Sequence, residues 1–184
     1  MTNLVEKSLV VLDTQSNEPR YRLLETIREY GLEKLLATDE LQSTRGRHLR
    51  HFVDQADIIR PMLTRQDQLH GHARAELELD NMRLALHWSL NSGQPELGLR
   101  LFSSLTRFWY KNMHWKEMVG WQERLAEALR LSGAPPSVHE ARSFYGAAML
   151  ATNYDPPHGR RLCERCVELS GPLDFEEEIG RAHV

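Results

Sequence analysis

The sequence predicts a mainly α fold, with an N-terminal β-hairpin followed by a solenoid of α-helical hairpins. Three observations predict it. Two short runs flank a polar turn within residues 9–23, one apolar and one alternating between polar and apolar residues, and no such pattern occurs elsewhere. After Leu24 the apolar residues recur every three or four positions, which is the spacing of one helix face. Residues 96–131 match the stretch that follows them at a fixed shift, as repeated helical hairpins do.

The predicted hairpin comprises two short strands. Leu9-Val10-Val11-Leu12 is an apolar run that ends at Asp13, and Arg20-Tyr21-Arg22-Leu23 alternates polar and apolar residues. Between them lies a cluster of turn-forming residues, Gln15-Ser16-Asn17-Glu18-Pro19. A single hairpin is only marginally stable in water, so we expect it to pack against another element.

Three helices are predicted next. The second is closed by Pro61, because proline removes a helical hydrogen bond. The third ends at Asn91-Ser92-Gly93, with Pro95 beyond it. Residues 62–74, between the second and the third, are ambiguous. The three helices are lined by Leu24, Ile27, Gly31 and Leu35; by Leu49, Phe52, Val53, Ala56 and Ile59; and by Leu79, Met82, Leu86 and Leu90.

Four further helices complete the predicted body. A fourth is lined by Leu97, Leu101, Leu105 and Phe108, and a fifth by Met118, Trp121, Leu125 and Leu129. The fifth is stopped by Gly133-Ala134-Pro135-Pro136, and two more helices follow over about 137–152 and 157–170.

The helices repeat along the chain. A shift of 41 residues places Trp109 on Leu150 and Trp121 on Leu162. One helical hairpin cannot bury its own apolar face, so neighbouring hairpins must stack. Two helices in each such unit are typical of tetratricopeptide or related arrays.

The charge balance excludes some classes of protein. The 184 residues include 23 Lys and Arg and 26 Asp and Glu, a formal charge of −3. Coating nucleic acid or an anionic membrane needs a strong positive field, so neither is expected as the main task. No apolar run approaches the roughly 20 residues of a membrane span, and no secretory signal is visible. With only two cysteines, the chain is expected in a reducing cytoplasm.

Possible metal or thiol sites are incomplete. Cys163 and Cys166 form a CxxC pair, but a structural zinc site needs four ligands and no second pair is present. The pair also falls in the middle of a predicted helix, where two small interface residues are the simpler interpretation. His70 and His72 have no partner ligands at motif spacing and are expected in a surface loop.

A basic cluster lies on the second predicted helix. Its members are Arg45, Arg47, His48, Arg50 and His51. Such a cluster can contact phosphate. However, Leu49, Phe52 and Val53 run through it, so the solvent-exposed side of an amphipathic helix is the favoured interpretation.

Aromatic residues concentrate in the fourth and fifth helices. Trp109, Tyr110 and Trp115 form a candidate interaction surface, since aromatic side chains anchor interfaces. Aromatics also fill cores, and core filling is the favoured alternative; Trp121, between Met118 and Leu125, is expected in the core. No phosphate-cradling loop, nucleophile elbow or dinucleotide fingerprint occurs, so we expect no catalytic residue and no enzyme activity.

Several stretches resemble parts of one known family. Leu4–Val10, together with the string from Arg20 to Tyr30, resembles the end of the winged-helix domain in bacterial STAND-type ATPase transcriptional regulators, the large LuxR-type or antibiotic-regulator-like proteins. Their linker helices are resembled by Arg45-x-Arg47-His48 followed by Phe52, and then by the segment from Glu78 to Trp88. Phe108 to Leu129 resembles their first tetratricopeptide-like hairpin.

The resemblance implies a layout and a mechanism. Residues 1–38 would be the end of a winged-helix domain, 39–93 linker helices and 94–178 tetratricopeptide-like repeats. In such regulators an ATPase core switches between ADP and ATP states while the repeats sense an effector. ATP or ADP and Mg²⁺ are thus implied for an ATPase domain outside this chain. Where relatives place a Met-His-Asp motif against the nucleotide, this chain has Leu23-Leu24-Glu25, so no cofactor-binding residue is expected in it.

The expected partners follow from the same resemblance. They are the regulator's own ATPase domain and an unknown protein or small-molecule effector. Direct DNA binding is not expected, because a hairpin without its recognition helix cannot enter a groove. No membrane partner is expected either.

Both ends of the sequence suggest a fragment. Met1 falls inside what should be a continuous domain, and residues 179–184 interrupt a helix in its first turns. The codons ATC GGA AGA GCA CAC GTC encode these six residues and match a common sequencing adapter. We therefore expect residues 179–184 to be a non-native tail.

Two alternatives to a regulator fragment remain. One is a stand-alone helical-repeat scaffold protein with no ATPase partner. The other is a metal- or thiol-dependent activity at Cys163 and Cys166.

Overall fold

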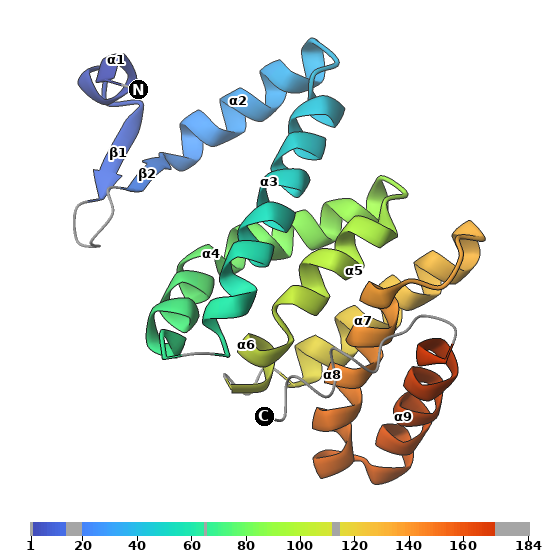
Figure 1. The fold of residues 1–184 in the computed structure, drawn as a ribbon. Coiled ribbons are helices and arrows are strands. Elements are labelled where there is room, and N and C mark those ends of the chain that lie inside the picture. The colour runs from blue at the N-terminus through green and yellow to red at the C-terminus, as the bar shows by residue number, and fades with distance from the viewer. Residues whose placement is uncertain (1, 14–19, 65, 112–114, 172–184) are drawn as a thin grey trace. The chain divides into compact units, whose positions relative to one another are not determined.

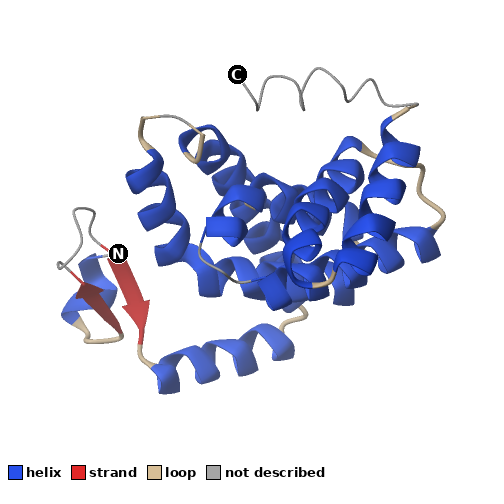
Figure 2. Ribbon diagram, turned by 90° about the horizontal axis from the view of Figure 1, so that it is seen from below, coloured by secondary structure: helices blue, strands red, loops and turns tan. Residues whose placement is uncertain are grey.

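The computed structural model of the chain describes residues 2–13, 20–64, 66–111 and 115–171. The chain divides into two compact units, Met1–Arg45 and Gly46–Val184. The described part is mainly helical, with one two-stranded antiparallel hairpin near the N-terminus (Figure 2). The predicted fold class is therefore confirmed.

The first unit contains the hairpin and a helix that follows it directly (Figure 1). Its elements are α1 (Thr2–Glu6), β1 (Val10–Asp13), β2 (Arg20–Leu23) and α2 (Glu25–Ala37). The strands pair antiparallel, as predicted for a hairpin, and the register places Val10 opposite Leu23. The short helix α1 was not predicted, because five residues are too few for an apolar spacing to show.

The first unit has almost no core of its own. Val10 is the one apolar side chain buried among its described residues, and α2 buries none. Leu24, Tyr30 and Leu36 on or beside α2 are 46%, 57% and 61% exposed. Because burial of apolar surface is the main force that stabilises a fold, this unit depends on packing against something else.

The second unit is a series of seven helices in the described part of the chain. The first of them begins within the first unit. They are α3 (Leu41–Met62), α4 (Gln68–Asn91), α5 (Pro95–Ser104), α6 (Thr106–Lys111), α7 (Trp115–Ser132), α8 (Val138–Tyr154) and α9 (Pro156–Ser170).

Three boundaries differ from the prediction. Pro61 lies inside the last turn of α3 and not beyond its end. The ambiguous stretch 62–74 contains the first turns of α4, where exposed Leu69 and buried Gly71 obscure the apolar spacing. The prediction of a single fourth helix is wrong, because the chain forms two helices, α5 and α6, on either side of Leu105. Leu105 and Phe108 remain fully buried, so the apolar spacing continues across the break and hides it.

Glycines end two helices where the sequence suggested, and side-chain caps that the sequence analysis did not single out begin two others. Gly93 and Gly133 adopt left-handed backbone angles, with φ of 66° and 69°. Gly93 lies just beyond the C-cap of α4, and Gly133 directly follows α7. Ser137 accepts a hydrogen bond from the Glu140 backbone N–H at 3.2 Å and caps α8. Asp155 caps α9 in the same way, through the His158 backbone N–H at 3.1 Å.

The helices of the second unit pack as stacked antiparallel pairs. Helix α5 packs on α4, α7 and α8, while α7 packs on α8 and α8 on α9. One continuous apolar core runs from α3 to α8 and contains Phe102, Phe108, Trp109 and Trp121. The residues related by the 41-residue shift mostly share burial, since Trp109, Leu150, Trp121 and Leu162 are all buried.

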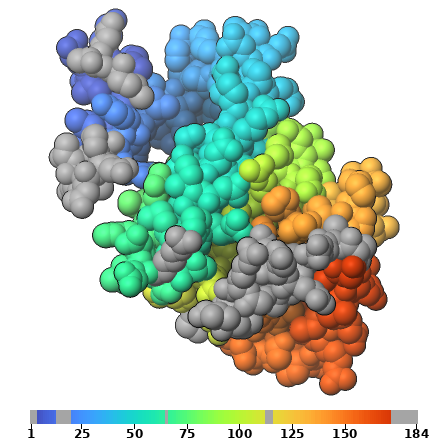
Figure 3. Space-filling view, in the orientation of Figure 1, coloured from blue at the N-terminus to red at the C-terminus, as the bar shows by residue number. Residues whose placement is uncertain are grey.

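The pair α8–α9 is held together by small residues. In the space-filling view of Figure 3, the orange surface of α8 and the red surface of α9 meet directly. Gly159 on α9 lies so close to α8 that an added Cβ would come within 2.6 Å of the Thr152 backbone nitrogen. Alanines on α8 face the same contact, namely Ala147, Ala148 and Ala151 with Leu162. The contact between α8 and α9 is thus made by close approach of the two helices and not by large side chains.

Gln122 is the least satisfied polar residue of the described core. Its side chain is 1% exposed, and neither amide atom has a hydrogen-bond partner among the described residues. We expect Gln122→Met to raise the free energy of unfolding by about 1–2 kcal/mol, because methionine fills a similar volume without unpaired polar atoms. Urea denaturation measures this change in the free energy of unfolding. The control is Gln68→Met at an exposed position, for which we expect a change near zero. A less stable Gln122→Met protein would show that the amide is paired in solution.

Candidate interaction surface

The predicted aromatic surface is only partly placed at the surface. Trp109 has no exposed area, and it stacks on Phe102 with ring centroids 6.1 Å apart. Its assignment to an interaction surface is therefore wrong, since α6 turns the indole into the core. Tyr110 is 48% exposed and stays a candidate. Trp115 is the first residue of α7, and its side chain lies outside the described residues.

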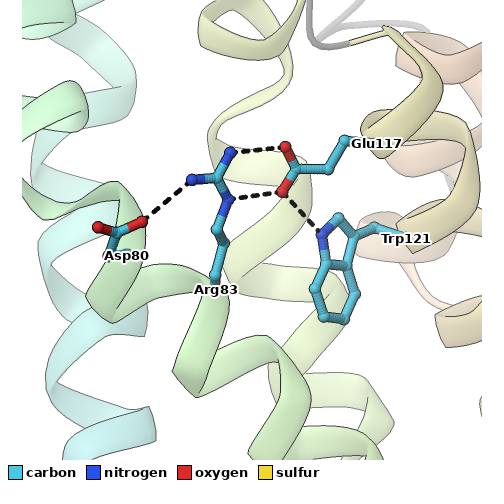
Figure 4. Close-up of polar contacts among 4 residues, drawn as sticks. All are labelled: Asp80, Arg83, Glu117 and Trp121. Atoms are coloured by element: carbon cyan, nitrogen blue, oxygen red, sulfur yellow. Dashed lines mark hydrogen bonds and ion pairs between the residues drawn. The ribbon is translucent and has the colours of Figure 1, made fainter.

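An ion pair joins α4 to α7 (Figure 4). Arg83 donates from Nε and Nη2 to the two carboxylate oxygens of Glu117, both at 2.7 Å. Asp80 accepts a further bond from Arg83 at 3.1 Å, and the Trp121 indole N–H donates to Glu117 at 3.3 Å. The hydrogen bond to Glu117 raises the pKa of Arg83 above its ordinary value. This bidentate geometry fixes the register of the two helices.

A shallow hollow lies beside this ion pair. Its volume is about 320 Å³, and it is lined by Lys116, Glu117, Gly120, Trp121 and Arg124. The Arg124 guanidinium stacks over the Trp121 ring, 4.0 Å from the centroid. The apolar wall of the hollow is thus already covered by a cation from the same helix.

A second polar bridge joins α3 to α5. Arg100 donates from Nε and Nη2 to one oxygen of Asp57, at 2.9 and 2.6 Å, and the Ser104 hydroxyl donates to the other at 2.7 Å. Burial raises the pKa of Asp57, but the bonds from Ser104 and Arg100 outweigh it, so the net pKa is below the ordinary value. Asp57 is therefore a carboxylate at neutral pH.

The charges of this bridge also act on His139, on α8. Its Nδ1 is buried and has no hydrogen-bond partner among the described residues. Burial, followed by the positive charges of Arg142 and Arg100, lowers the pKa of His139, and Arg60 adds to the effect. Charged groups of α3, α5 and α8 therefore influence this imidazole, which is neutral at neutral pH. The sequence did not reveal this group, because its members come from three helices.

The basic cluster takes the simpler of its two interpretations. Leu49, Phe52 and Val53 are buried while Arg47 and Arg50 beside them are exposed, as an amphipathic helix requires.

The prediction that His70 and His72 lie in a surface loop is wrong, because both residues lie on helix α4. Among the described residues, no three His, Cys, Asp or Glu side chains are placed to hold a metal ion. None of the helices in the described segments has the length and apolar character that a membrane crossing requires.

The two cysteines differ in environment, which predicts different reactivity. Cys163 is exposed, whereas Cys166 is 6% exposed and burial raises the pKa of its thiol. Because the thiolate is the reactive form, we expect a disulfide-exchange reagent to modify Cys163 rapidly and Cys166 only on unfolding. Absorbance of the released thiol in native and denatured protein measures this. A Cys163→Ser variant should lose the rapid phase, and two rapid equivalents in wild type would contradict the buried position of Cys166.

Comparison with known proteins finds longer bacterial relatives. The chain is 38% identical over 155 residues to a Mycobacterium tuberculosis protein (strain H37Rv) that carries the name "Putative HTH-type transcriptional regulator", and equally to its Mycobacterium bovis counterpart. The match covers 83% of this chain but only 17% of those proteins. An "Uncharacterized protein" of Mycobacterium tuberculosis is 33% identical over 57 residues, 31% of this chain and 14% of that protein. No family model and no solved structure matches the chain.

Proposed function

We propose that this chain, which is related to proteins named HTH-type transcriptional regulators, is the sensor part of a STAND-type ATPase transcriptional regulator. The observation that carries the proposal is the 38% identity over 155 residues, a match that spans only 17% of the length of the longer regulators. A segment of that size would perform only one part of a regulator's function.

In the proposed mechanism the first unit belongs to a winged-helix domain that packs on the ATPase domain. The exposed apolar residues Leu24, Tyr30 and Leu36 support it, because they give this unit a surface that another domain can bury. ATP or ADP with Mg²⁺ would be bound by that ATPase domain and not by this chain.

The second unit would be the start of a tetratricopeptide-like sensor array. Its packing supports this: α5 contacts both α7, its partner in the pair, and α8, the first helix of the next pair, and α7 contacts α8 as well. Stacked pairs of this kind present an extended surface made by the first helix of each pair. An effector, either a protein or a small molecule, would bind there without catalysis, in the cytoplasm.

The DNA sequence upstream of Met1 tests the proposal. An in-frame segment that encodes a phosphate-binding loop, G-x-x-x-x-G-K-[ST], is the expected result. A promoter directly before Met1, with no open frame, would reject it. The purified chain itself should give no sequence-specific gel shift, because no recognition helix is expected in it.

A stand-alone helical scaffold is the second candidate. One observation favours it: the second unit has a continuous core of its own, from Leu49 to Leu150, and its helices α8 and α9 have side-chain caps. Such a unit can fold without an ATPase domain. The upstream sequence distinguishes the two candidates.

A further inference from the structure

We propose that the outward side of α4, together with the neighbouring part of α7, binds an amphipathic helix of a partner protein. The surface is formed by Leu77, Asp80 and Leu84 on α4 and by Gly120 and Arg124 on α7, and is called the α4–α7 outer face below. It belongs to the second helix of two successive pairs, whereas the effector surface proposed above is made by the first helices. The inference therefore goes beyond the proposed function.

Helix α4 carries apolar side chains on two opposite sides. Leu79, Met82 and Leu86 are buried in the core, while Leu77 and Leu84 are 53% and 59% exposed. The two exposed leucines are seven residues apart, so they lie on the same side of the helix, two turns from each other. A surface helix normally presents polar residues opposite the core. Leucines at this spacing form the kind of stripe on which a second helix packs.

Polar bonds hold α4 in place on both sides of this stripe. Arg74 donates to the Gln55 side chain of α3 at 2.8 Å, and Arg83 makes its two bonds to Glu117 of α7 (Figure 4). The outward side of α4 lies between these two anchor points. Because the surface is already ordered, a ligand loses little affinity to conformational rearrangement when it binds.

Helices α4 and α7 run in the same direction, so their outer sides form one surface. Arg83 contacts Glu117, and one turn later His87 meets the Trp121 ring edge-on, with ring centroids 4.8 Å apart. The residues of each pair are 34 positions apart, which fixes the register of the two helices. Beside the pairs lies the hollow at Gly120, where an added Cβ would meet nothing within 4 Å. A partner can therefore approach the α7 backbone closely there.

Two groups of opposite charge lie towards the two ends of the α4–α7 outer face. Asp80 is 94% exposed, and only one of its carboxylate oxygens has a hydrogen-bond partner among the described residues, Arg83 at 3.1 Å. Arg124 lies over the Trp121 ring but makes no hydrogen bond or ion pair within the described part of the chain. An arginine ordered on an aromatic ring keeps its donors for a carboxylate.

This charge pattern selects the partner. By the register of the two helices, Asp80 and Arg124 are separated by about ten residues, or about 15 Å, along the helix direction. An amphipathic helix with leucines on one side, a basic residue near one end and an acidic residue about ten positions away matches both charges and the apolar stripe. The exposed carboxylate of Asp80 between the leucines repels a nucleic-acid backbone, and a partner strand finds no sheet edge on α4 or α7.

Fluorescence anisotropy of a labelled synthetic peptide tests the proposal. The peptide is an amphipathic helix of about 18 residues, or about five turns, with leucines along one side, a lysine near one end and a glutamate about ten residues from it. It is made in both sequence orders, because a helix can bind parallel or antiparallel to α4. One order should bind the chain, and Leu84→Glu should weaken this binding by about tenfold or more. The matched control, Val167→Glu at an exposed position on α9, should leave the affinity unchanged.

A charge exchange tests the contact at Arg124. Arg124→Glu should weaken binding about fivefold, and a peptide with lysine in place of its glutamate should restore the affinity for this variant. Arg160→Glu, at an exposed position on α9, is the matched control and should bind the original peptide as the wild type does. All four substituted side chains are exposed, so we expect each variant to fold, and circular dichroism checks this.

Other outcomes overturn the proposal. If neither peptide order binds, or if the Leu84→Glu protein binds equally well, the face is not a helix-binding site. Failure of the charge exchange would reject Arg124 as the contact for the acidic residue. Analytical ultracentrifugation of the chain without peptide adds a further check: self-association that Leu84→Glu abolishes would mean that a second copy covers the face. None of these results bears on the regulator assignment, which the upstream DNA sequence tests separately.

Discussion

Replacing Gly159 by alanine is expected to destabilise the protein by about 2 kcal/mol, although alanine is the better helix former. The added methyl carbon would lie 2.6 Å from the backbone nitrogen and 2.7 Å from the Cα of Thr152 on α8. Backbone atoms cannot rotate away as a flexible side chain can, so α8 and α9 must separate. The small residues between the two helices then lose their van der Waals contacts. Chemical denaturation gives the change, and faster hydrogen exchange of the α9 amides locates it.

Gly120 provides the matched control for this experiment. It also lies within a helix, α7, but an added Cβ there meets nothing within 4 Å. Gly120→Ala should therefore stabilise the protein by about 0.5–1 kcal/mol through helix propensity alone. The two substitutions are chemically identical and opposite in expected sign. A Gly159→Ala protein as stable as Gly120→Ala would mean that α8 and α9 lie further apart than the structure shows.

Replacing Trp109 by alanine is expected to cost about 3–5 kcal/mol, a large part of the stability of a typical domain. The side chain is fully buried, stacks on Phe102 and meets the Phe108 ring edge-on with centroids 5.5 Å apart. Its removal leaves a cavity that the surrounding helices cannot fill. The measurement is the free energy of unfolding from urea titration, followed by far-ultraviolet circular dichroism.

Tyr110 separates a structural role from an interaction role. It neighbours Trp109 but is 48% exposed, so Tyr110→Ala should change stability by no more than about 0.5 kcal/mol. A binding defect in the Trp109→Ala protein would accordingly reflect lost structure. If Trp109→Ala unfolded no more easily than Tyr110→Ala, the assignment of Trp109 to the core would be wrong.

The sequence predicts most of the fold because the signals for it are local. The spacing of Leu49, Phe52 and Ile59 marks the buried side of α3, and Gly93 and Gly133 mark the ends of α4 and α7 by their backbone angles. The break at Leu105 escapes prediction for a physical reason. Both helix pieces direct their apolar residues into one core, so the spacing shows burial and not backbone continuity.

The candidate surface could not be predicted in the same way. Asp57 and Arg100 are 43 residues apart, and Arg83 and Glu117 are 34 apart, so only the stacking order brings each pair together. Charged residues at such separations look like ordinary solvent-exposed positions along the chain. The aromatic composition that suggested Trp109 as a contact residue equally describes a core, and the turn between α5 and α6 decides between the two.

The break at Leu105 also bears on how the stack assembles. Helix α6 has six residues, fewer than an isolated helix needs to form in water, because its nucleation cost is not recovered by so few backbone hydrogen bonds. Yet it contributes Phe108 and Trp109, both fully buried. Its formation is therefore coupled to the docking of α5, α7 and α8, and the aromatic centre of the core becomes ordered only when the neighbouring pairs come together. The short helix α6 thus contributes to cooperative folding of the successive helix pairs.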